Sequence, residues 1–401
     1  MSDLNFLQGY LELNSGTEIP KPFALWSGVS GISAALGRSV WIDMGTYTIF
    51  PNFFVVLIAP SGQFRKSTGA KLIQRMLLEM RDQVNLIPEK VTPEGLIDCL
   101  GMGQDAQPGN WKPNKECVGF VFADELNFFL NRRTYDAGLN SILIKLFDCN
   151  ELVDTYTRVR GSRTLTNSCL GLLGASTADW LRSAIPEDAI GGGLTSRMIF
   201  VYTEELPPPV PWTTFSDKKK KLFETLTNSL RRIATLEGPI TLTQDARDFY
   251  EKKYIDFYYD KKLFSDKNLA GYASRRGVHL LKLSIVVAVS ESPSLTIDAH
   301  HIKHALQLLE IAESYMSRVL RLIATAPIGE MTEFVYNVID RRHKVRYAEL
   351  LSLTSHKLSA TELLDILKTL QDSERVHRED SQTTTWFHTG SSKSPSPTPK
   401  K

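Results

Sequence analysis

The chain has 401 residues, of which 42% are hydrophobic and 23% charged, and its formal net charge is only +2. These values exclude a largely disordered chain and predict a sizeable core with two or three domains. No apolar run reaches the roughly 18 residues that a membrane span needs, and the amino end lacks a basic-then-apolar signal, so we expect a cytoplasmic protein with no membrane contact. Because the net charge is small, binding to nucleic acid would have to come from local basic patches.

Hydrophobic patterning divides the chain into five parts. The pattern of residues 1–48 predicts an amphipathic helical segment before the core, which we call the lead-in. The pattern of residues 49–205 alternates strands with helices, as expected for an α/β domain with a parallel sheet. A stiff connector containing LPPPVPW ends this core, and a helical region follows, which we assign as a lid over residues 206–327. Residues 328–390 predict a further small domain, and the Ser/Pro/Lys-rich tail at 391–401 predicts disorder.

The first functional candidate is APSGQFRKST at 59–68, which follows the apolar run FFVVLI at 53–58 and precedes an amphipathic helix. A phosphate-binding loop needs this context: a buried strand, a glycine-containing turn, then a helix whose first backbone N–H groups face the phosphates. The lysine neutralises phosphate charge, and the following hydroxyl binds Mg²⁺. The residues expected to bind nucleotide here are Gly62, Arg65, Lys66, Ser67 and Thr68.

The loop departs from the usual pattern G-x-x-x-x-G-K-[ST]. Ala59 stands where the first glycine belongs, Arg65 stands where the second belongs, and one extra residue lies between Gly62 and Lys66. Taken alone, the stretch therefore leaves a nucleotide loop and an ordinary strand-loop-helix turn both open.

A second element, VGFVFADE at 118–125, is a hydrophobic strand that ends in two acids. Asp124 can hold Mg²⁺ together with the Ser67 hydroxyl, and Glu125 can orient and deprotonate the attacking water. An isolated Asp-Glu pair is more often a strand end capped by solvated acids. The two elements together favour a site for ATP and Mg²⁺.

Two later stretches add candidates for the same chemistry. NSCLGLLGAST at 167–177 predicts another buried strand, and the hydroxyls of Ser176 and Thr177 at its end can reach the γ-phosphate or the lytic water. In IGGGLTSR at 190–197, a run of glycines is followed by Arg197, just before a further predicted strand. Arg197 can act as a finger in the neighbouring subunit's site, or it can be a surface residue of a loop.

In these motifs the sequence resembles the helicase-like ATPases of phages and integrated mobile elements, a family often described only as a domain of unknown function and commonly joined to or encoded beside a primase. The resemblance covers roughly residues 4 to 320 and includes an arginine before the loop lysine. It rests on PKPFALWSGVSGISAALGRSVWID, PNFFVVLIAPSGQFRKST, FADELNFFL, LLGAST, GGGLTSRMIFVY and ASRRGVHLLKLSIVVA.

The resemblance implies a RecA-like or AAA+ P-loop NTPase core and ATP-driven translocation on DNA. It also implies a lid helix whose Arg275 or Arg276 touches phosphate, and a primase partner. From the residues alone, these two arginines can equally be a helix start on a solvated face.

Two stretches bear on DNA. TYTRVRGSRTL at 155–165 predicts a hairpin around Gly161 that carries Arg158, Arg160 and Arg163 and no acid, so it can grip phosphates in the central channel of a ring. It can also be an exposed hairpin with solubilising arginines. Residues 328–390 follow the element order of a winged helix, a module that binds DNA or serves as a protein contact.

Three histidines, His300, His301 and His304, lie near the start of a predicted helix. Their i, i+4 spacing can hold a metal ion, but no carboxylate accompanies them at the usual spacing, so the sequence favours no metal site there.

The sequence thus predicts a ring-forming replicative DNA helicase or translocase, a homo-oligomer and possible hexamer with single-stranded DNA in its channel. The main alternative is an ATP-dependent initiator or helicase loader that binds DNA without translocating. A structural protein with an inactive nucleotide site is supported only by Ala59 and the unusual loop.

Overall fold

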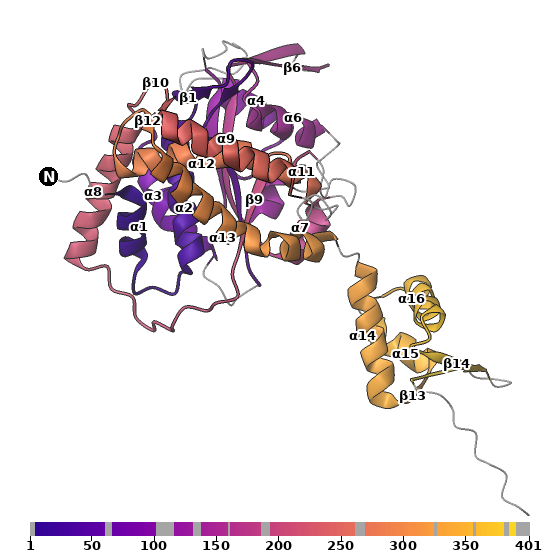
Figure 1. Ribbon diagram of the computed structural model, residues 1–401. Coiled ribbons are helices and arrows are strands. Elements are labelled where there is room, and N and C mark those ends of the chain that lie inside the picture. Colours follow the sequence, from indigo (N-terminus) through magenta and orange to yellow (C-terminus); the bar gives the residue numbers. More distant parts are fainter. Residues whose placement is uncertain are drawn as a thin grey trace, which may run out of the picture. The chain divides into compact units, whose positions relative to one another are not determined.

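A computed structural model of the protein describes residues 5–60, 66–101, 116–130, 138–158, 161–185, 193–260, 269–324, 327–355, 358–380 and 385–389. The chain divides into two compact units, residues 1–324 and 325–401, which are described separately (Figure 1). The lead-in, the core and the lid expected from the sequence all belong to the first unit. The division lies close to the boundary expected after residue 327, and the tail at 391–401 lies outside the described residues.

A five-stranded sheet, in which all strands are parallel, lies at the heart of the first unit (Figure 1). Every residue of its two central strands β3 and β8 is buried. Strands buried on both faces are typical of parallel sheets covered by helices, which explains their nearly continuous apolar sequences. The predicted α/β class with a parallel sheet is therefore confirmed. In spatial order the strands are β4 (Leu86–Ile87), β5 (Val118–Ala123), β8 (Cys169–Ser176), β3 (Phe54–Ile58) and β9 (Met198–Tyr202).

Helices surround this sheet. α2 contacts β3, β8 and β9, whereas α3, α5 and α6 contact β8. The long helices α12 and α13 pack side by side across the unit (Figure 1). The α-helices described in this unit are α1 (Phe6–Asn14), α2 (Lys21–Leu36), α3 (Lys66–Leu78), α4 (Pro93–Gly101), α5 (Leu126–Phe129), α6 (Gly138–Phe147), α7 (Ala178–Ala184), α8 (Asp217–Ile233), α9 (Gln244–Tyr258), α11 (Ala270–Ala273), α12 (Arg276–Glu291) and α13 (Ala299–Ala324).

The lead-in differs from the amphipathic helical segment that we expected. Thirteen of the sixteen residues of α2 are buried, including Trp26, because both the sheet and α1 pack on it. A helix that is buried on nearly all sides belongs to the core and has no polar face to reveal it. The segment also ends in two short strands, β1 (Val40–Asp43) and β2 (Thr48–Ile49), which form a small sheet with β10 (Gly238–Pro239).

Two further small sheets complete the unit. β11 (Thr241–Leu242) pairs in parallel with β12 (Thr296–Ile297), in the connection between α12 and α13. β6 (Leu152–Thr157) and β7 (Gly161–Thr166) pair antiparallel, so the predicted hairpin is confirmed.

The second unit has its own hydrophobic core, which contains Val335, Ile366 and Phe387. Its elements follow the order expected from the sequence, and the strands form an antiparallel sheet in the order β13-β15-β14. They are α14 (Pro327–Arg342), β13 (Lys344–Arg346), α15 (Tyr347–Thr354), α16 (Ala360–Asp372), β14 (His377–Asp380) and β15 (Thr385–His388).

Among the described helices of both units, none combines the length and the apolar character that a membrane crossing requires.

The contact between α2 and α3 gives a test of this packing. A Cβ at Gly31 would overlap the side chain of the fully buried Ile73 in α3, so Gly31→Ala should lower the free energy of unfolding by roughly 1–3 kcal/mol. The matched control is Gly138→Ala in α6, where a Cβ meets no atom of the described residues within 4 Å. Denaturant unfolding of both variants checks this, and a Gly31→Ala protein as stable as the control would contradict the close packing of the two helices.

Candidate functional site

The carboxyl ends of three neighbouring strands bring predicted site residues to one edge of the sheet. Ile58, the last residue of β3, pairs with Ser176, the last residue of β8. Ala123, the last residue of β5, pairs with Gly174 of the same strand β8. Asp124 therefore lies at this edge, and strand β8 separates it from the loop that follows β3. In open α/β sheets this edge is where ligands bind.

Helix α3 begins at this edge with Lys66, directly after the candidate loop. Its first turn contains no acidic residue, so the partial positive charge of the helix N-terminus is not offset locally. Thr68 is exposed on this turn. The side chains of Lys66 and Ser67, and all of Gly62 and Arg65, lie outside the described residues.

Asp124 is the most informative residue of this edge. Its backbone N–H donates a hydrogen bond to Glu89 Oε2 at 2.9 Å, which holds the start of the turn after β5. Its Oδ1 is buried and has no hydrogen-bond partner among the described residues. Burial raises the pKa of this carboxyl group, and the ammonium of Lys71 opposes that shift. A buried acceptor without a partner is costly in a folded protein, so the site is suited to a ligand that donates to Asp124 or carries positive charge.

Glu125 and Thr177 both begin helices at this edge. Glu125 is exposed and precedes α5, and its side chain makes no capping hydrogen bond to that helix. Thr177 caps α7, because its Oγ1 accepts a hydrogen bond from the backbone N–H of Trp180 at 3.2 Å. Ser176 is buried, and its hydroxyl donates to the carbonyl of Thr177 at 3.2 Å. The sheet thus brings together Asp124, Glu125, Ser176 and Thr177.

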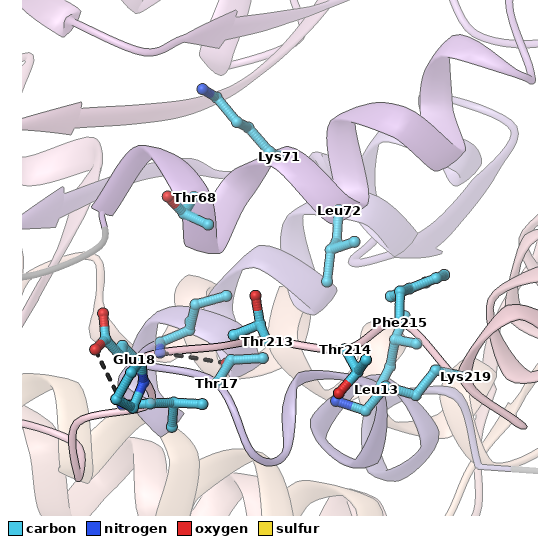
Figure 2. A pocket seen from close by; sticks show the side chains of 13 residues that line it. Leu13, Thr17, Glu18, Thr68, Lys71, Leu72, Thr213, Thr214, Phe215 and Lys219 are labelled. Carbon is cyan, nitrogen blue, oxygen red and sulfur yellow. Dashed lines mark hydrogen bonds between the residues drawn. The ribbon is translucent and has the colours of Figure 1, made fainter. Parts of the chain in front are cut away.

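A pocket of about 400 Å³ adjoins the first turns of α3 (Figure 2). One wall comes from α3, and the opposite wall comes from the turn between α1 and α2 and from the proline-rich connector. Glu18 ties the last two together, because its Oε1 accepts a hydrogen bond from the backbone N–H of Val210 at 3.0 Å. The lining residues include Leu13, Thr17, Ile19, Thr68, Leu72 and Phe215.

Arg197 lies at the opposite edge of the sheet. It immediately precedes Met198, which pairs with Phe54 near the start of β3, so about 13 Å of strand separates it from the carboxyl edge. Its side chain is only 6% exposed. The guanidinium binds both carboxylate oxygens of Asp148 and the carbonyl of Gly193 in the same chain.

The two lid arginines lie away from the carboxyl edge as well. Arg275 approaches the same carboxylate, at 3.4 Å from Asp148 Oδ1, and its side chain is 32% exposed. Arg276 is buried and forms two hydrogen bonds, of 2.7 and 2.6 Å, with the carboxylate of Glu313 in α13. The described residues therefore do not bring either arginine to the candidate phosphate site within one chain, and Arg276 has a structural role between two helices.

No protein-family model matches this sequence, and no curated protein does.

The arginines expected to contact DNA belong to the hairpin. Arg158 is exposed in its turn, and Arg163 lies in β7 opposite Thr155. Gly161 begins β7 with φ +68°, a conformation that glycine adopts without strain and that allows the chain to turn back. Arg160 lies outside the described residues.

Sequence reasoning missed a second pocket at the amino edge of the sheet. It has a volume of about 270 Å³, and its walls include Phe147, Asp148, Arg275 and Lys282. Lys282 is buried, and its ammonium donates hydrogen bonds to Asn52 Oδ1 at 2.6 Å and to the Asn52 carbonyl at 3.1 Å. The one available signal was a lysine in the middle of the apolar helix that runs from Val278 to Val289.

The ion pair between Arg197 and Asp148 can be tested by a double-mutant cycle. Arg197→Ala and Asp148→Ala should each destabilise the protein, because each removes the main partner of a partly buried charge. The double variant should recover roughly 1.5–3 kcal/mol relative to the sum of the single effects, the range typical of hydrogen bonds to charged groups. Urea unfolding of the four proteins measures the coupling. Additive effects would show that the pair does not stabilise this fold.

Proposed function

We propose that the protein is an ATP-dependent DNA helicase or translocase of replication that acts as a ring oligomer, with a RecA-like or AAA+ P-loop core. The observation that carries this proposal is the buried Oδ1 of Asp124, which has no hydrogen-bond partner among the described residues, at the edge where α3 begins. A carboxylate in this position suits the Mg²⁺ that accompanies a nucleoside triphosphate.

In the proposed site, the residues of this edge have different roles in ATP hydrolysis. The backbone N–H groups at the start of α3 and the ammonium of Lys66 bind the phosphates, assisted by Gly62, Arg65 and Thr68 in the same loop and turn. Ser67 and Asp124 would hold Mg²⁺, which would supply charge stabilisation to the phosphates. Glu125 accepts the proton of the attacking water, and Ser176 and Thr177 orient that water or the γ-phosphate.

The pocket beside α3 suits the nucleoside part of ATP. It adjoins Thr68, and its walls combine apolar side chains such as Leu72 and Phe215 with the hydroxyl of Thr17. An apolar slot with a few polar groups is the usual environment of a bound base. The turn between α1 and α2 and the connector, tied together through Glu18, then both belong to the nucleotide site.

The arginines at the opposite edge of the sheet would act in a neighbouring subunit. In a ring, the edge that carries Arg197 and Arg275 can face the carboxyl edge of the next copy, where a positive charge would stabilise the transferring phosphate. Arg275 is the more accessible of the two. Arg197 and Asp148 then position it, because Asp148 contacts both guanidinium groups.

The nucleotide site is tested by two substitutions with different expected results. Lys66→Ala should lose ATP binding because the phosphates lose their main cation, whereas Glu125→Gln should bind ATP and hydrolyse it at least ~100-fold more slowly, since general-base catalysis is removed. Binding of a fluorescent ATP analogue and phosphate release measure the two effects. Lys145→Ala and Glu116→Gln, at exposed positions, are the matched controls. Turnover at the control rate in both site variants would refute the assignment.

The hairpin supports DNA as the partner. Arg158 is exposed beside Tyr156, which is 75% exposed, and Figure 1 shows the strands of the hairpin extending from the body of the unit. Arginine with an exposed aromatic ring is a combination that binds the backbone and bases of single-stranded nucleic acid.

Replacement of Arg158, Arg160 and Arg163 by alanine should abolish the stimulation of ATPase by single-stranded DNA while basal hydrolysis persists, because the phosphate site is elsewhere. The salt dependence of DNA binding should flatten by a slope of about 0.7 for each DNA phosphate that the variant no longer neutralises. ATPase and fluorescence anisotropy at several salt concentrations measure these effects. The matched control removes the same charge from exposed positions outside the hairpin, with Arg81, Arg232 and Arg247 changed to alanine.

The second unit is the basis of the alternative function, a replication initiator or helicase loader. We propose that residues 328–390 form a winged helix, supported by the order of its three helices and three strands. If DNA binding survives the hairpin substitutions and disappears on removal of residues 325–401, the initiator or loader function replaces the helicase.

A further inference from the structure

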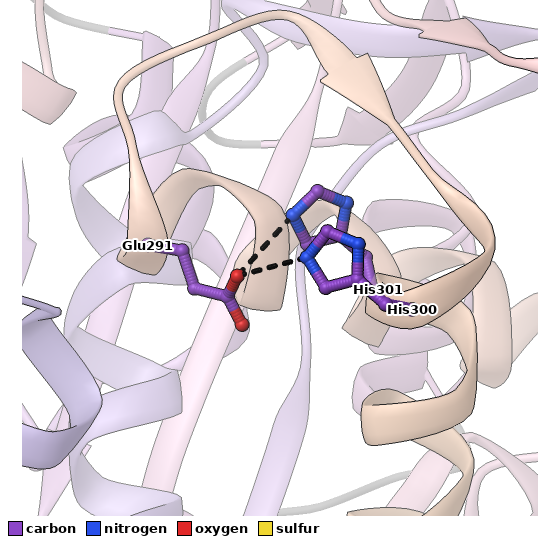
Figure 3. A group of neighbouring side chains, drawn as sticks. All are labelled: Glu291, His300 and His301. Carbon is purple, nitrogen blue, oxygen red and sulfur yellow. Dashed lines mark hydrogen bonds and ion pairs between the residues drawn. The ribbon is translucent and has the colours of Figure 1, made fainter.

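The connection between α12 and α13 gathers one carboxylate and three imidazoles. Glu291 is the last residue of α12, and His300, His301 and His304 lie in the first two turns of α13. Figure 3 shows the carboxylate of Glu291 directed toward the rings of His300 and His301. The sequence offered no carboxylate at the usual spacing, and the fold supplies one from the preceding helix.

Three histidine nitrogens lie close to the two oxygens of this carboxylate, and one possible ligand atom from each of Glu291, His300 and His301 lies within 4.8 Å of the others. Glu291 Oε2 lies 3.0 Å from His300 Nε2 and 3.5 Å from His301 Nε2, and Glu291 Oε1 lies 3.5 Å from His304 Nδ1. Zinc binds imidazole nitrogen and carboxylate oxygen at about 2.0–2.2 Å in a tetrahedron, which places neighbouring ligand atoms roughly 3.3–3.5 Å apart. The single carboxylate supplies one formal negative charge for a divalent cation.

The hydrogen bonds of the histidine rings distinguish their roles. His301 is buried, and its Nδ1 accepts a hydrogen bond from the backbone N–H of Asp298 at 2.9 Å. An uncharged ring that accepts at Nδ1 carries its proton on Nε2, so His301 donates toward Glu291 and does not offer a lone pair to a metal. His300 is not held at Nδ1 in this way: that atom lies 4.0 Å from Asp298 Oδ2, beyond hydrogen-bond distance, and the Nε2 of His300 lies 3.0 Å from Glu291 Oε2. The exposed ring of His300 is therefore free to carry its proton on Nδ1 and to offer the lone pair of Nε2 when a metal ion binds between it and Glu291.

We propose that Glu291, His300 and His304 bind one divalent transition-metal ion such as Zn²⁺, with His301 and Asp298 orienting the ligands. His300 and His304 are four residues apart on the same face of α13, and the His304 side chain is 38% exposed, so its ring can rotate into the site. Such an ion would join the carboxyl end of α12 to the first turns of α13. Water fills the remaining coordination position, since His300 is 59% exposed.

Zinc binding to the full-length protein tests this site, with Zn²⁺ titrated against a chromophoric chelator. His300→Ala, His304→Ala and Glu291→Gln should each bind Zn²⁺ at least tenfold more weakly than the unmodified protein. His343→Asn in the second unit is the matched control, because it removes an exposed histidine at a positive φ that asparagine tolerates. Zinc should also raise the thermal midpoint of the unmodified protein but not that of the double variant His300→Ala/His304→Ala.

Two results would overturn the proposal. Equal zinc affinity of the unmodified protein and the double variant would place any bound zinc elsewhere, and X-ray absorption that reveals sulfur ligands would do the same. Loss of affinity in His301→Gln together with unchanged affinity in His304→Ala would assign the third ligand to His301. None of these measurements involves nucleotide, so the outcome is independent of the proposed ATPase.

Discussion

The parallel pairing of β3 with β8 on one side and β9 on the other determines where the chemistry of this protein lies. Because all five strands run the same way, the residues that follow them collect at one edge and the residues that precede them collect at the other. The carboxyl edge receives acids, hydroxyls and the start of α3. The amino edge receives Arg197 and the residues that surround it. The apolar burial that stabilises the sheet therefore also separates the edge proposed to bind ATP from the edge proposed to face a neighbouring subunit.

The amino edge shows how a buried site accommodates several cations. Arg38 donates hydrogen bonds to the carbonyls of Cys149 and Ser168, at 2.7 and 3.0 Å, and Lys282 binds Asn52. Backbone and amide oxygens thus accept the hydrogen bonds of Arg38 and Lys282, as the carboxylate of Asp148 accepts those of Arg197. Such partners are needed because an unpaired charge inside a protein is costly. Burial lowers the pKa of His279 to about 3, so that ring stays neutral among the cations. An arginine that acts from this edge in a neighbouring subunit must make only partial contacts within its own chain, which favours Arg275 over Arg197.

Sequence patterns predicted the parts of this structure that depend on neighbouring residues. The alternation around Gly161 predicted the hairpin, and strand ends marked by Asp124 and Ser176 identified the carboxyl edge. Contacts between distant residues left no such pattern. The family resemblance implied that Arg276 touches phosphate, and no sequence pattern showed that Glu313 lies beside it. The closeness of a carboxylate to His300 was hidden because Glu291 comes from the preceding helix. The burial of α2 escaped prediction for a related reason, since a helix covered on all sides has no amphipathic period.

Helix α12 links several of these features physically. Fourteen of its sixteen residues are buried, so it cannot rotate without breaking the core, and at 1.5 Å per residue it spans about 24 Å. Its first turn lies beside Arg275 and contains Arg276, which is paired with Glu313, and its last residue is Glu291. A metal ion at Glu291 and the ion pair at Arg276 would then connect the two ends of α12 to the same partner helix, α13. Because the core already holds α12 along nearly its whole length, the metal ion proposed at Glu291 would add a restraint only at the end of α12 that lies farthest from Arg275.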